Sequence, residues 1–153
     1  AGDLTSLMRR LLVIAYEDIG LGNPQGAARA VSAVQAAERL GLPEARIPLA
    51  NAIIELALSP KSNTAIRSID SALSDVRKGR AISIPDHLKD AHYSGAQKLG
   101  RGVGYKYPHD YPGHFVKQQY LPDALKNEEY FKAEPTSSYE DALMKQYQKY
   151  RQK

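Results

Sequence analysis

Apolar residues recur at helical spacing in four successive stretches of the first 80 residues, and glycine or proline separates each stretch from the next. In the first stretch they fall at every third or fourth position, which places them on one face of a helix. These residues are Leu4, Leu7, Met8, Leu11, Leu12 and Ala15. Asp3 is a suitable N-cap, and Gly20 or Gly22 is a suitable end.

The second stretch predicts a helix over residues 24–40, since Asn23-Pro24 is a start signal and Gly41 a stop signal. The predicted inner face is made of small residues, which allow a neighbouring helix to approach closely. It consists of Ala27, Ala30, Val31, Val34 and Ala37.

The third stretch predicts a helix over residues 43–58, and the fourth predicts one over residues 61–78. The inward residues expected in the third are Ile47, Ala50, Ile53, Ile54 and Ala57. One face of the fourth carries Ile66, Ile69, Leu73 and Val76. Because short connections make consecutive helices antiparallel, we predict an all-α fold based on a bundle of about four antiparallel helices.

The composition changes after the fourth stretch, where nine of the ten tyrosines, both phenylalanines and all four histidines lie. We predict a short helix over residues 86–99 and an irregular glycine- and tyrosine-rich segment over 100–121 that wraps the bundle. A last helix is predicted over 138–151, where Ser137 or Ser138 with Glu140 or Asp141 gives a capping signal. Residues 1–80 are thus the predicted bundle core, and residues 81–153 extend the same domain.

The formal net charge of +4 is spread evenly along the chain, with +2 in residues 1–80 and +2 in residues 81–153. No basic block marks a nucleic-acid arm, although a patch can still assemble in space. The absence of cysteine excludes disulfides, thiolate zinc sites and cysteine nucleophiles. No apolar run approaches the roughly 20 residues of a membrane span. We therefore expect a cytoplasmic protein with no membrane partner.

Two polar motifs near helix ends have a structural and a chemical interpretation. Glu17 and Asp18 lie near the expected end of the first helix, where carboxylates are unfavourable. We favour hydrogen bonds to the next helix, or pairing with Lys or Arg, over a catalytic carboxylate pair, because no nucleophile or metal-ligand cluster accompanies them. Lys61-Ser62-Asn63 begins a helix and could bind an anion, but we favour a capping turn in which Lys61 pairs with Glu17 or Asp18.

The glycine- and histidine-containing motifs of the second half are weak signals. Residues 100–104 (GRGVG) lack the Gly-Lys-Ser/Thr ending of a phosphate-binding loop, and no strand is expected before them. His109, Asp110 and His114 could be imagined as metal ligands, but their spacing fits a structural His–Asp pair better. No pattern of catalytic residues is present, so we do not expect this chain to be an enzyme by itself.

Tyrosines and basic residues alternate in the irregular segment, as they do in surfaces that bind single-stranded nucleic acid. The tyrosines are Tyr105, Tyr107, Tyr111 and Tyr120. The same residues also suit packing on the helices or a protein interface. The basic last helix is either a solvated helix end or a second DNA contact. The candidate DNA contacts are Lys106, Lys117, Lys145, Lys149 and Arg151.

Three segments together resemble the C-terminal region of the bacterial RarA/MgsA ATPases, which are AAA+ relatives of the clamp loaders and similar to the eukaryotic Werner-helicase-interacting protein. They are residues 9–20 (RRLLVIAYEDIG), 59–63 (SPKSN) and 104–110 (GYKYPHD), in the order that the family has them. The positions to which we assign a fold or interface role are Glu17, Asp18, Gly20, Pro60, Lys61, Ser62, Asn63, Tyr105, Tyr107, His109 and Asp110.

The resemblance implies a helical domain similar to the oligomerisation collar of clamp loaders, typically assembled as a homotetramer. It also implies that the chain is a fragment of a longer ATPase that acts in rescue of stalled replication forks, recombination and DNA repair. ATP and Mg would bind in the missing ATPase part, so we expect no cofactor here. The implied location is the bacterial nucleoid or replisome.

Two functions remain open at this point. The first is an oligomerisation module, with the small residues Ala27, Ala30, Val31 and Val34 as the candidate oligomer face. The second is a docking module for DNA, or for a replication partner such as a single-stranded-DNA-binding protein, through the tyrosine and lysine residues of the irregular segment and the basic last helix.

Overall fold

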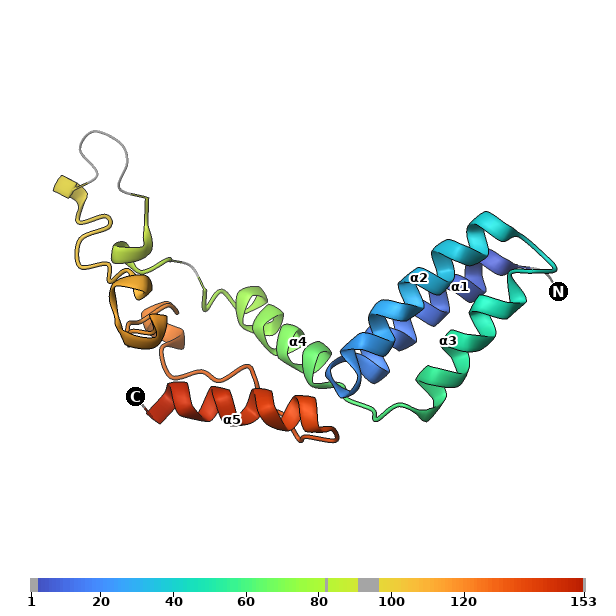
Figure 1. The fold of residues 1–153 in the computed structure, drawn as a ribbon. Coiled ribbons are helices and arrows are strands. Elements are labelled where there is room, and N and C mark those ends of the chain that lie inside the picture. Colours follow the sequence, from blue (N-terminus) through green and yellow to red (C-terminus); the bar gives the residue numbers. More distant parts are fainter. Residues whose placement is uncertain (1–2, 82, 91–96, 153) are drawn as a thin grey trace. The chain divides into compact units, whose positions relative to one another are not determined.

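A computed structural model describes residues 3–81, 83–90 and 97–152 of the 153-residue chain. Within these ranges there is no strand, and five α-helices are connected by turns and shorter helices (Figure 1). The α-helices are α1 (Leu4–Ile14), α2 (Pro24–Leu40), α3 (Arg46–Leu58), α4 (Thr64–Arg77) and α5 (Ser138–Gln152). The predicted all-α class is confirmed. None of the helices in the described ranges has the length and apolarity needed to cross a membrane.

The chain forms two compact units. Unit 1 comprises Ala1–Ile69 and Phe131–Gln148, and unit 2 comprises Asp70–Tyr130 and Lys149–Lys153. Helices α4 and α5 therefore each contribute residues to both units. This grouping differs from a division of the chain near residue 80, because the segment before α5 and most of α5 belong with the first three helices.

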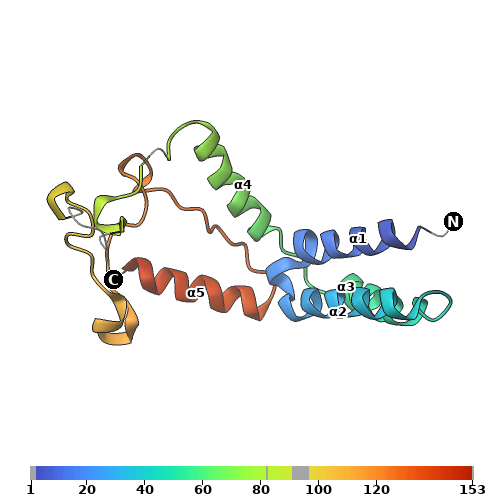
Figure 2. The same ribbon diagram turned by 90° about the horizontal axis from the view of Figure 1, so that it is seen from above.

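The core of unit 1 is formed by α1, α2 and α3, which lie side by side (Figures 1 and 2), together with the turn that joins α1 to α2. Its buried apolar residues are Met8, Leu11, Ala15, Ile19, Ala27, Ala30, Val34, Ala37, Ala45, Leu49, Ala52 and Leu56. Alanines supply half of this set, so the helices meet through small side chains. The predicted inner face of α2 is confirmed.

The predicted inner face of α3 is wrong. Leu49, Ala52 and Leu56 face the core, whereas all five residues predicted to point inward are exposed: Ile47, Ala50, Ile53, Ile54 and Ala57. Nearly all side chains of α3 are apolar, so hydrophobic periodicity cannot distinguish its two sides. The side that packs on α2 was decided by the tertiary structure.

The end of the first predicted helix is irregular. After α1 the chain continues as a π-helix over Ala15–Ile19 and a 3₁₀ turn over Gly20–Gly22. The Asn23 side chain then accepts a hydrogen bond from the Gly26 N–H at 2.9 Å and caps α2. Single π-turns inside helices are rare and often mark functional positions.

Helix α4 adds no residue to the buried core, so the core contains three helices rather than the four predicted. Three of the four residues predicted to share one face of α4 are exposed: Ile69, Leu73 and Val76. The helix begins at Thr64, three residues later than predicted, because residues 61–63 have no helical structure.

Unit 2 consists mainly of turns. Residues 100–121 contain no α-helix and only two 3₁₀ turns, Pro108–Asp110 and Pro112–His114. The helix predicted over residues 86–99 is wrong in its described part, where only the 3₁₀ turns Asp86–Leu88 and Gln97–Leu99 occur. Residues 91–96 of that prediction lie outside the described residues.

A buried carboxylate, Asp75, organises unit 2. It accepts hydrogen bonds from the Tyr130 hydroxyl at 2.9 Å and from the Arg80 guanidinium at 2.6 Å, and Arg80 also pairs with Glu128 at 2.7 Å. The Tyr130 hydrogen bond is the largest contribution that lowers the pKa of Asp75, and the Arg80 contacts lower it further. Because Asp75 and Tyr130 lie 55 residues apart, this hydrogen bond joins the two ends of the Asp70–Tyr130 stretch of unit 2.

Candidate functional site

The turn between α1 and α2 packs its backbone directly against the segment between α3 and α4. The Ser62 N–H donates a hydrogen bond to the Asp18 carbonyl at 2.9 Å. Gly22 is buried, and a Cβ atom added to it would lie 2.3 Å from the Pro60 carbonyl oxygen. Gly20 has φ of +44°, a conformation that glycine adopts most easily. Only glycine at these two positions permits so close an approach.

A fully buried glutamate lies beside this contact. The Glu140 carboxylate accepts hydrogen bonds from the hydroxyls of Ser62 and Thr64, both at 2.6 Å, and from the Thr136 N–H at 3.3 Å. We call these four residues the Glu140 cluster. Ser62 and Thr64 are themselves buried, and no buried side-chain nitrogen or oxygen among the described residues lacks a hydrogen-bond partner.

The Glu140 cluster contains no cation. Burial raises the pKa of the Glu140 carboxyl, but the hydrogen bonds from Ser62, Thr64 and Thr136 outweigh that effect and hold the pKa below its usual value. Thr64 is also the first residue of α4, so the positive end of that helix lies next to the carboxylate. Hydroxyl groups, an N–H and a helix terminus together replace the missing counter-ion.

The start of α5 is bonded to the same region. The Glu140 N–H donates to the Ser137 hydroxyl at 3.2 Å, which is the N-cap interaction suggested by the Ser-x-x-Glu pattern. The Thr136 hydroxyl donates to the Lys61 carbonyl at 2.6 Å, and the Ser137 hydroxyl to the Leu21 carbonyl at 3.4 Å. Three segments that lie far apart in the sequence therefore meet here within unit 1.

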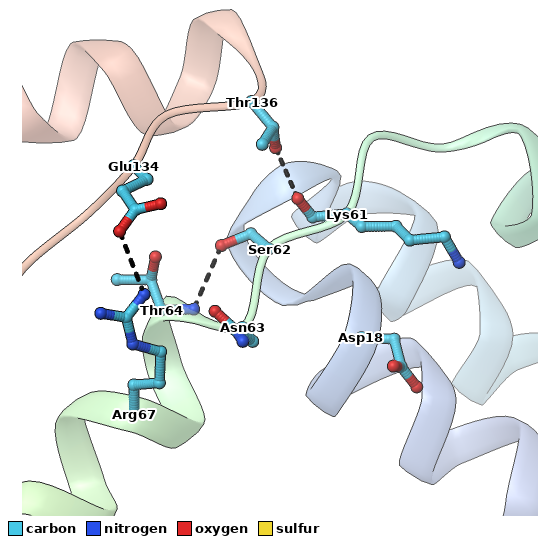
Figure 3. Close-up of a pocket in the computed structure, with 8 residues that line it drawn as sticks. All are labelled: Asp18, Lys61, Ser62, Asn63, Thr64, Arg67, Glu134 and Thr136. Atoms are coloured by element: carbon cyan, nitrogen blue, oxygen red, sulfur yellow. Dashed lines mark hydrogen bonds and ion pairs between the residues drawn. The ribbon is translucent and has the colours of Figure 1, made fainter.

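A polar cavity of about 330 Å³ opens at this meeting point (Figure 3). Arg67 and Glu134 cross one side of it with a 3.5 Å ion pair. Asp18 and Lys61 also line it, but no ion pair joins them among the described residues. The favoured pairing of Lys61 with Glu17 or Asp18 is therefore wrong. Glu140 already lies next to the start of α4, which disfavours the alternative of a bound anion.

The surroundings of the cavity offer no catalytic arrangement among the described residues. The hydroxyls of Ser62 and Thr64 donate to Glu140 and that of Thr136 donates to the Lys61 carbonyl, so none of the three donates to a histidine or lysine base. No group of three or more His, Asp or Glu residues in the described ranges could hold a metal ion. The geometry therefore supports a structural junction that fixes the start of α4 and α5 against the α1–α2 turn.

Comparison with known proteins identifies the family. The family model described as "MgsA AAA+ ATPase C terminal" matches residues 1–151. The chain belongs to this family. It is 63% identical over 149 residues to the replication-associated recombination protein A of Bacillus subtilis, a match that covers 97% of this chain and 35% of that protein.

More distant relatives have the same relation to the chain. The Escherichia coli K12 replication-associated recombination protein A is 32% identical, over 85% of this chain and 29% of its own length. ATPase WRNIP1 of Dictyostelium discoideum is 31% identical, over 82% of this chain and 14% of its own length. The chain thus spans about a third or less of these relatives, which agrees with the resemblance to a C-terminal region.

The residues predicted from the sequence to have a fold or interface role fall into two places. Gly20, Pro60, Ser62 and the Asp18 carbonyl form the backbone junction. The side chains of Glu17 and Asp18 are exposed and accept no hydrogen bond from α2, because Asn23 caps that helix instead. The predicted contact of these two carboxylates with the second helix is therefore wrong for the described residues.

The second group of motif residues lies in unit 2. Tyr105 and Tyr107 are exposed, and the ring of His109 packs against Tyr107 and His114 at centroid distances of 5.1 and 4.9 Å. No hydrogen bond joins Asp110 to either histidine in the described part of the chain, and in place of the predicted His–Asp pair the His109 ring makes tilted contacts with the other two rings. The predicted packing of this segment on the bundle remains a prediction.

The predicted oligomer face and DNA contacts have different environments. Ala27, Ala30 and Val34 are buried in the core of unit 1 and Val31 is half-buried, so α1 and α3 already occupy that face. Among the candidate DNA contacts, Lys145 pairs with Asp141 at 2.6 Å and Arg151 with Glu129 at 2.5 Å. The other candidate cations are exposed: Lys106, Lys117 and Lys149.

Sequence reasoning did not identify Glu140, Thr64 and Thr136 as members of one site. The Ser137-x-x-Glu140 pattern marks the start of α5, and that start was predicted. Nothing in the pattern shows that the glutamate is buried or that its partners lie 76 and 78 residues earlier. A polar network of this kind depends on how distant segments pack.

Proposed function

We propose that this chain is the assembly domain of a RarA/MgsA-type AAA+ ATPase that acts in rescue of stalled replication forks, recombination and DNA repair. The observation that carries the proposal is the outward face of α3, which we call the α3 face. It consists of Ile47, Ala50, Ile53, Ile54, Ala57 and Leu58, all exposed. Asn51 is also exposed and lies among them as the one uncharged polar residue of α3. An apolar helix face of this kind is normally covered.

No charged residue interrupts the α3 face. The charged residues of α3 are Arg46 at its start and Glu55, which bonds to Arg29 of α2. Leu40 and Leu42, at the α2–α3 connection, are exposed as well and extend the apolar surface. An uncharged apolar surface of this kind is typical of obligate interfaces between identical subunits, which resemble a protein core cut in two.

The partner that we propose for the α3 face is a second copy of the chain. A symmetric contact uses the same patch on both subunits, so one apolar face is sufficient to form it. The small-residue face of α2, the first candidate for this role, is already buried within one chain. Val34→Glu is therefore expected to unfold unit 1. A contact through the α3 face, by contrast, can be broken without unfolding either subunit.

We expect Ile54→Glu to dissociate the assembly while leaving the helices folded. Burying an unpaired carboxylate in an apolar contact costs on the order of 3 kcal/mol, which raises the dissociation constant about 100-fold. Light scattering over a concentration series measures the mass, and circular dichroism measures helicity. The α3 face alone would give a dimer of about 34 kDa, twice the 16.9 kDa of one chain, and the tetramer of about 68 kDa would need a second contact between subunits.

The matched control is Ile84→Glu, which adds the same charge at an isoleucine of equal exposure in unit 2, 61% against 59% for Ile54. It should leave the mass unchanged. A wild-type chain that is monomeric at all concentrations would contradict self-assembly of this domain. We would then expect the α3 face to contact the ATPase part of the longer protein instead.

The charge distribution favours nucleic-acid docking as a second candidate function. Unit 1 contains nine Lys and Arg against nine Asp and Glu, and unit 2 contains twelve against eight. The whole formal charge of +4 therefore belongs to unit 2, although it is even along the sequence. A steep fall of DNA affinity with salt concentration would support docking through unit 2, and an affinity independent of salt would exclude it.

A further inference from the structure

Two hollows of unit 2 share one exposed tyrosine. The first, of about 410 Å³, is lined by Tyr105 and Tyr120, and its other walls are His87, Leu88, Lys89, Asp90 and Gly102. The second, of about 560 Å³, is lined by Tyr120 together with Lys117 and Lys126. Tyr120 therefore stands between an aromatic hollow and a basic one.

The side chain of Gln118 links the backbone beside Tyr105 to the hydroxyl of Tyr120. Its amide accepts a hydrogen bond from the Lys106 N–H at 3.2 Å and donates to the Lys106 carbonyl at 2.8 Å. The same amide nitrogen donates to the Tyr120 hydroxyl at 2.9 Å. The backbone next to Tyr105 and the ring of Tyr120 are thus fixed by one residue, although both rings remain about half exposed.

The basic hollow carries unpaired cations. Lys117 and Lys126 are exposed and form no ion pair within the described part of the chain, and no acidic residue lines the hollow with them. Lys145 and Arg151, by contrast, are held by Asp141 and Glu129. Lys106 and Lys149 are exposed as well, but Lys117 and Lys126 are the cations that line the basic hollow together with Tyr120.

We propose that Tyr120 stacks on a base of a single-stranded nucleic acid whose phosphates are held by Lys117 and Lys126. The proposal rests on the second candidate function, nucleic-acid docking through unit 2, and assigns its site. An exposed aromatic ring flanked by unpaired cations is the arrangement that binds single strands, because stacking tolerates any base and the lysines meet the backbone.

A peptide is the other macromolecule that an aromatic hollow can bind. Peptide grooves for proline-rich segments also use aromatic rings, but they do not require unpaired lysines on one side. The net charge of unit 2 and the acid-free lining of the basic hollow favour a polyanion. A single-stranded nucleic acid can bind in both hollows at once, with a base on the aromatic ring and phosphates on the lysines, whereas a peptide would use only the aromatic hollow.

The test compares binding of an oligothymidylate of about 12 nucleotides with that of a strand of the same length that lacks bases, both measured by fluorescence anisotropy on the 153-residue chain. Tyr120→Leu should weaken binding of the oligothymidylate about tenfold or more and should not affect the abasic strand. Tyr120→Phe, which keeps the ring, should bind like the wild type. The control Tyr16→Leu removes a tyrosine of similar exposure in unit 1.

The outcomes separate this proposal from docking itself. Stacking on Tyr120 would be overturned if the wild type bound both strands with equal affinity. Docking of nucleic acid to unit 2 would still be supported if the double substitution Lys117→Ala with Lys126→Ala reduced that affinity and Lys145→Ala did not. No binding of either strand would overturn both. The proposal would also be overturned if the two strands bound equally and a proline-rich peptide displaced the oligothymidylate. The aromatic hollow would then be a binding site for a protein partner.

Discussion

Replacing Gly22 with alanine is expected to lower the free energy of unfolding by about 3 kcal/mol, because the new methyl group has no space. Its carbon would lie 2.3 Å from the Pro60 carbonyl oxygen and 2.9 Å from the Pro60 carbonyl carbon. Both are backbone atoms, so no side chain can rotate away. The α1–α2 turn and the segment before α4 would have to separate, which would also strain the Ser62 N–H to Asp18 hydrogen bond.

Thermal unfolding followed by circular dichroism measures this effect, and the expected loss corresponds to about 10 °C in the melting temperature. Gly79→Ala is the matched control. Gly79 has φ of +70° but no atom within 4 Å of an added Cβ, so its replacement costs only the left-handed conformation, about 1 kcal/mol. If Gly22→Ala were no more destabilising than Gly79→Ala, the close contact of the two segments would be wrong.

Glu140→Ala is the second substitution expected to have a large effect, also about 3 kcal/mol. It removes the only acceptor that the structure gives to the buried hydroxyls of Ser62 and Thr64. A buried hydroxyl without a partner costs its full desolvation free energy, so the loss exceeds that of one ordinary hydrogen bond. The Thr136 N–H loses its partner at the same time.

The control for Glu140→Ala is Glu134→Ala, which removes a carboxylate six residues earlier whose side chain is 85% exposed. Its ion pair with Arg67 is a surface contact, so the change should stay within about 0.5 kcal/mol. Urea unfolding of both variants gives the two free energies. Equal small losses would show that the Glu140 cluster does not hold unit 1 together.

The stability supplied by Glu140 should depend on pH. Because the folded protein holds the pKa of Glu140 below that of the unfolded chain, the carboxylate stabilises the fold at pH values above the unfolded-state pKa, about 4.3. This contribution decreases as the pH falls through the lower folded-state pKa. The difference in unfolding free energy between wild type and Glu140→Ala should therefore shrink below about pH 4. A difference that grows on acidification would contradict a charged Glu140.

Local patterns in the sequence determined the extent of α2 and the start of α5. The extent of α2 follows from the Asn23-Pro24 start and the Gly41 stop, and the start of α5 follows from the Ser137-x-x-Glu140 cap. These are interactions between residues close in the chain, so the sequence contains the whole cause. The family resemblance also rested on short segments, two of which meet in the structure at the α1–α2 turn.

Only the tertiary structure decided which faces and polar groups are buried. Helix α3 is apolar on both sides, so its packing on α2 through Leu49 and Leu56, with Ile54 left outside, depends on which side fits the small residues of α2. The burial of Glu140 depends on hydroxyls more than 70 residues away. The even charge along the sequence becomes +4 in unit 2 because the chain returns to unit 1 at Phe131. These properties arise from contacts between distant segments, which no local pattern encodes.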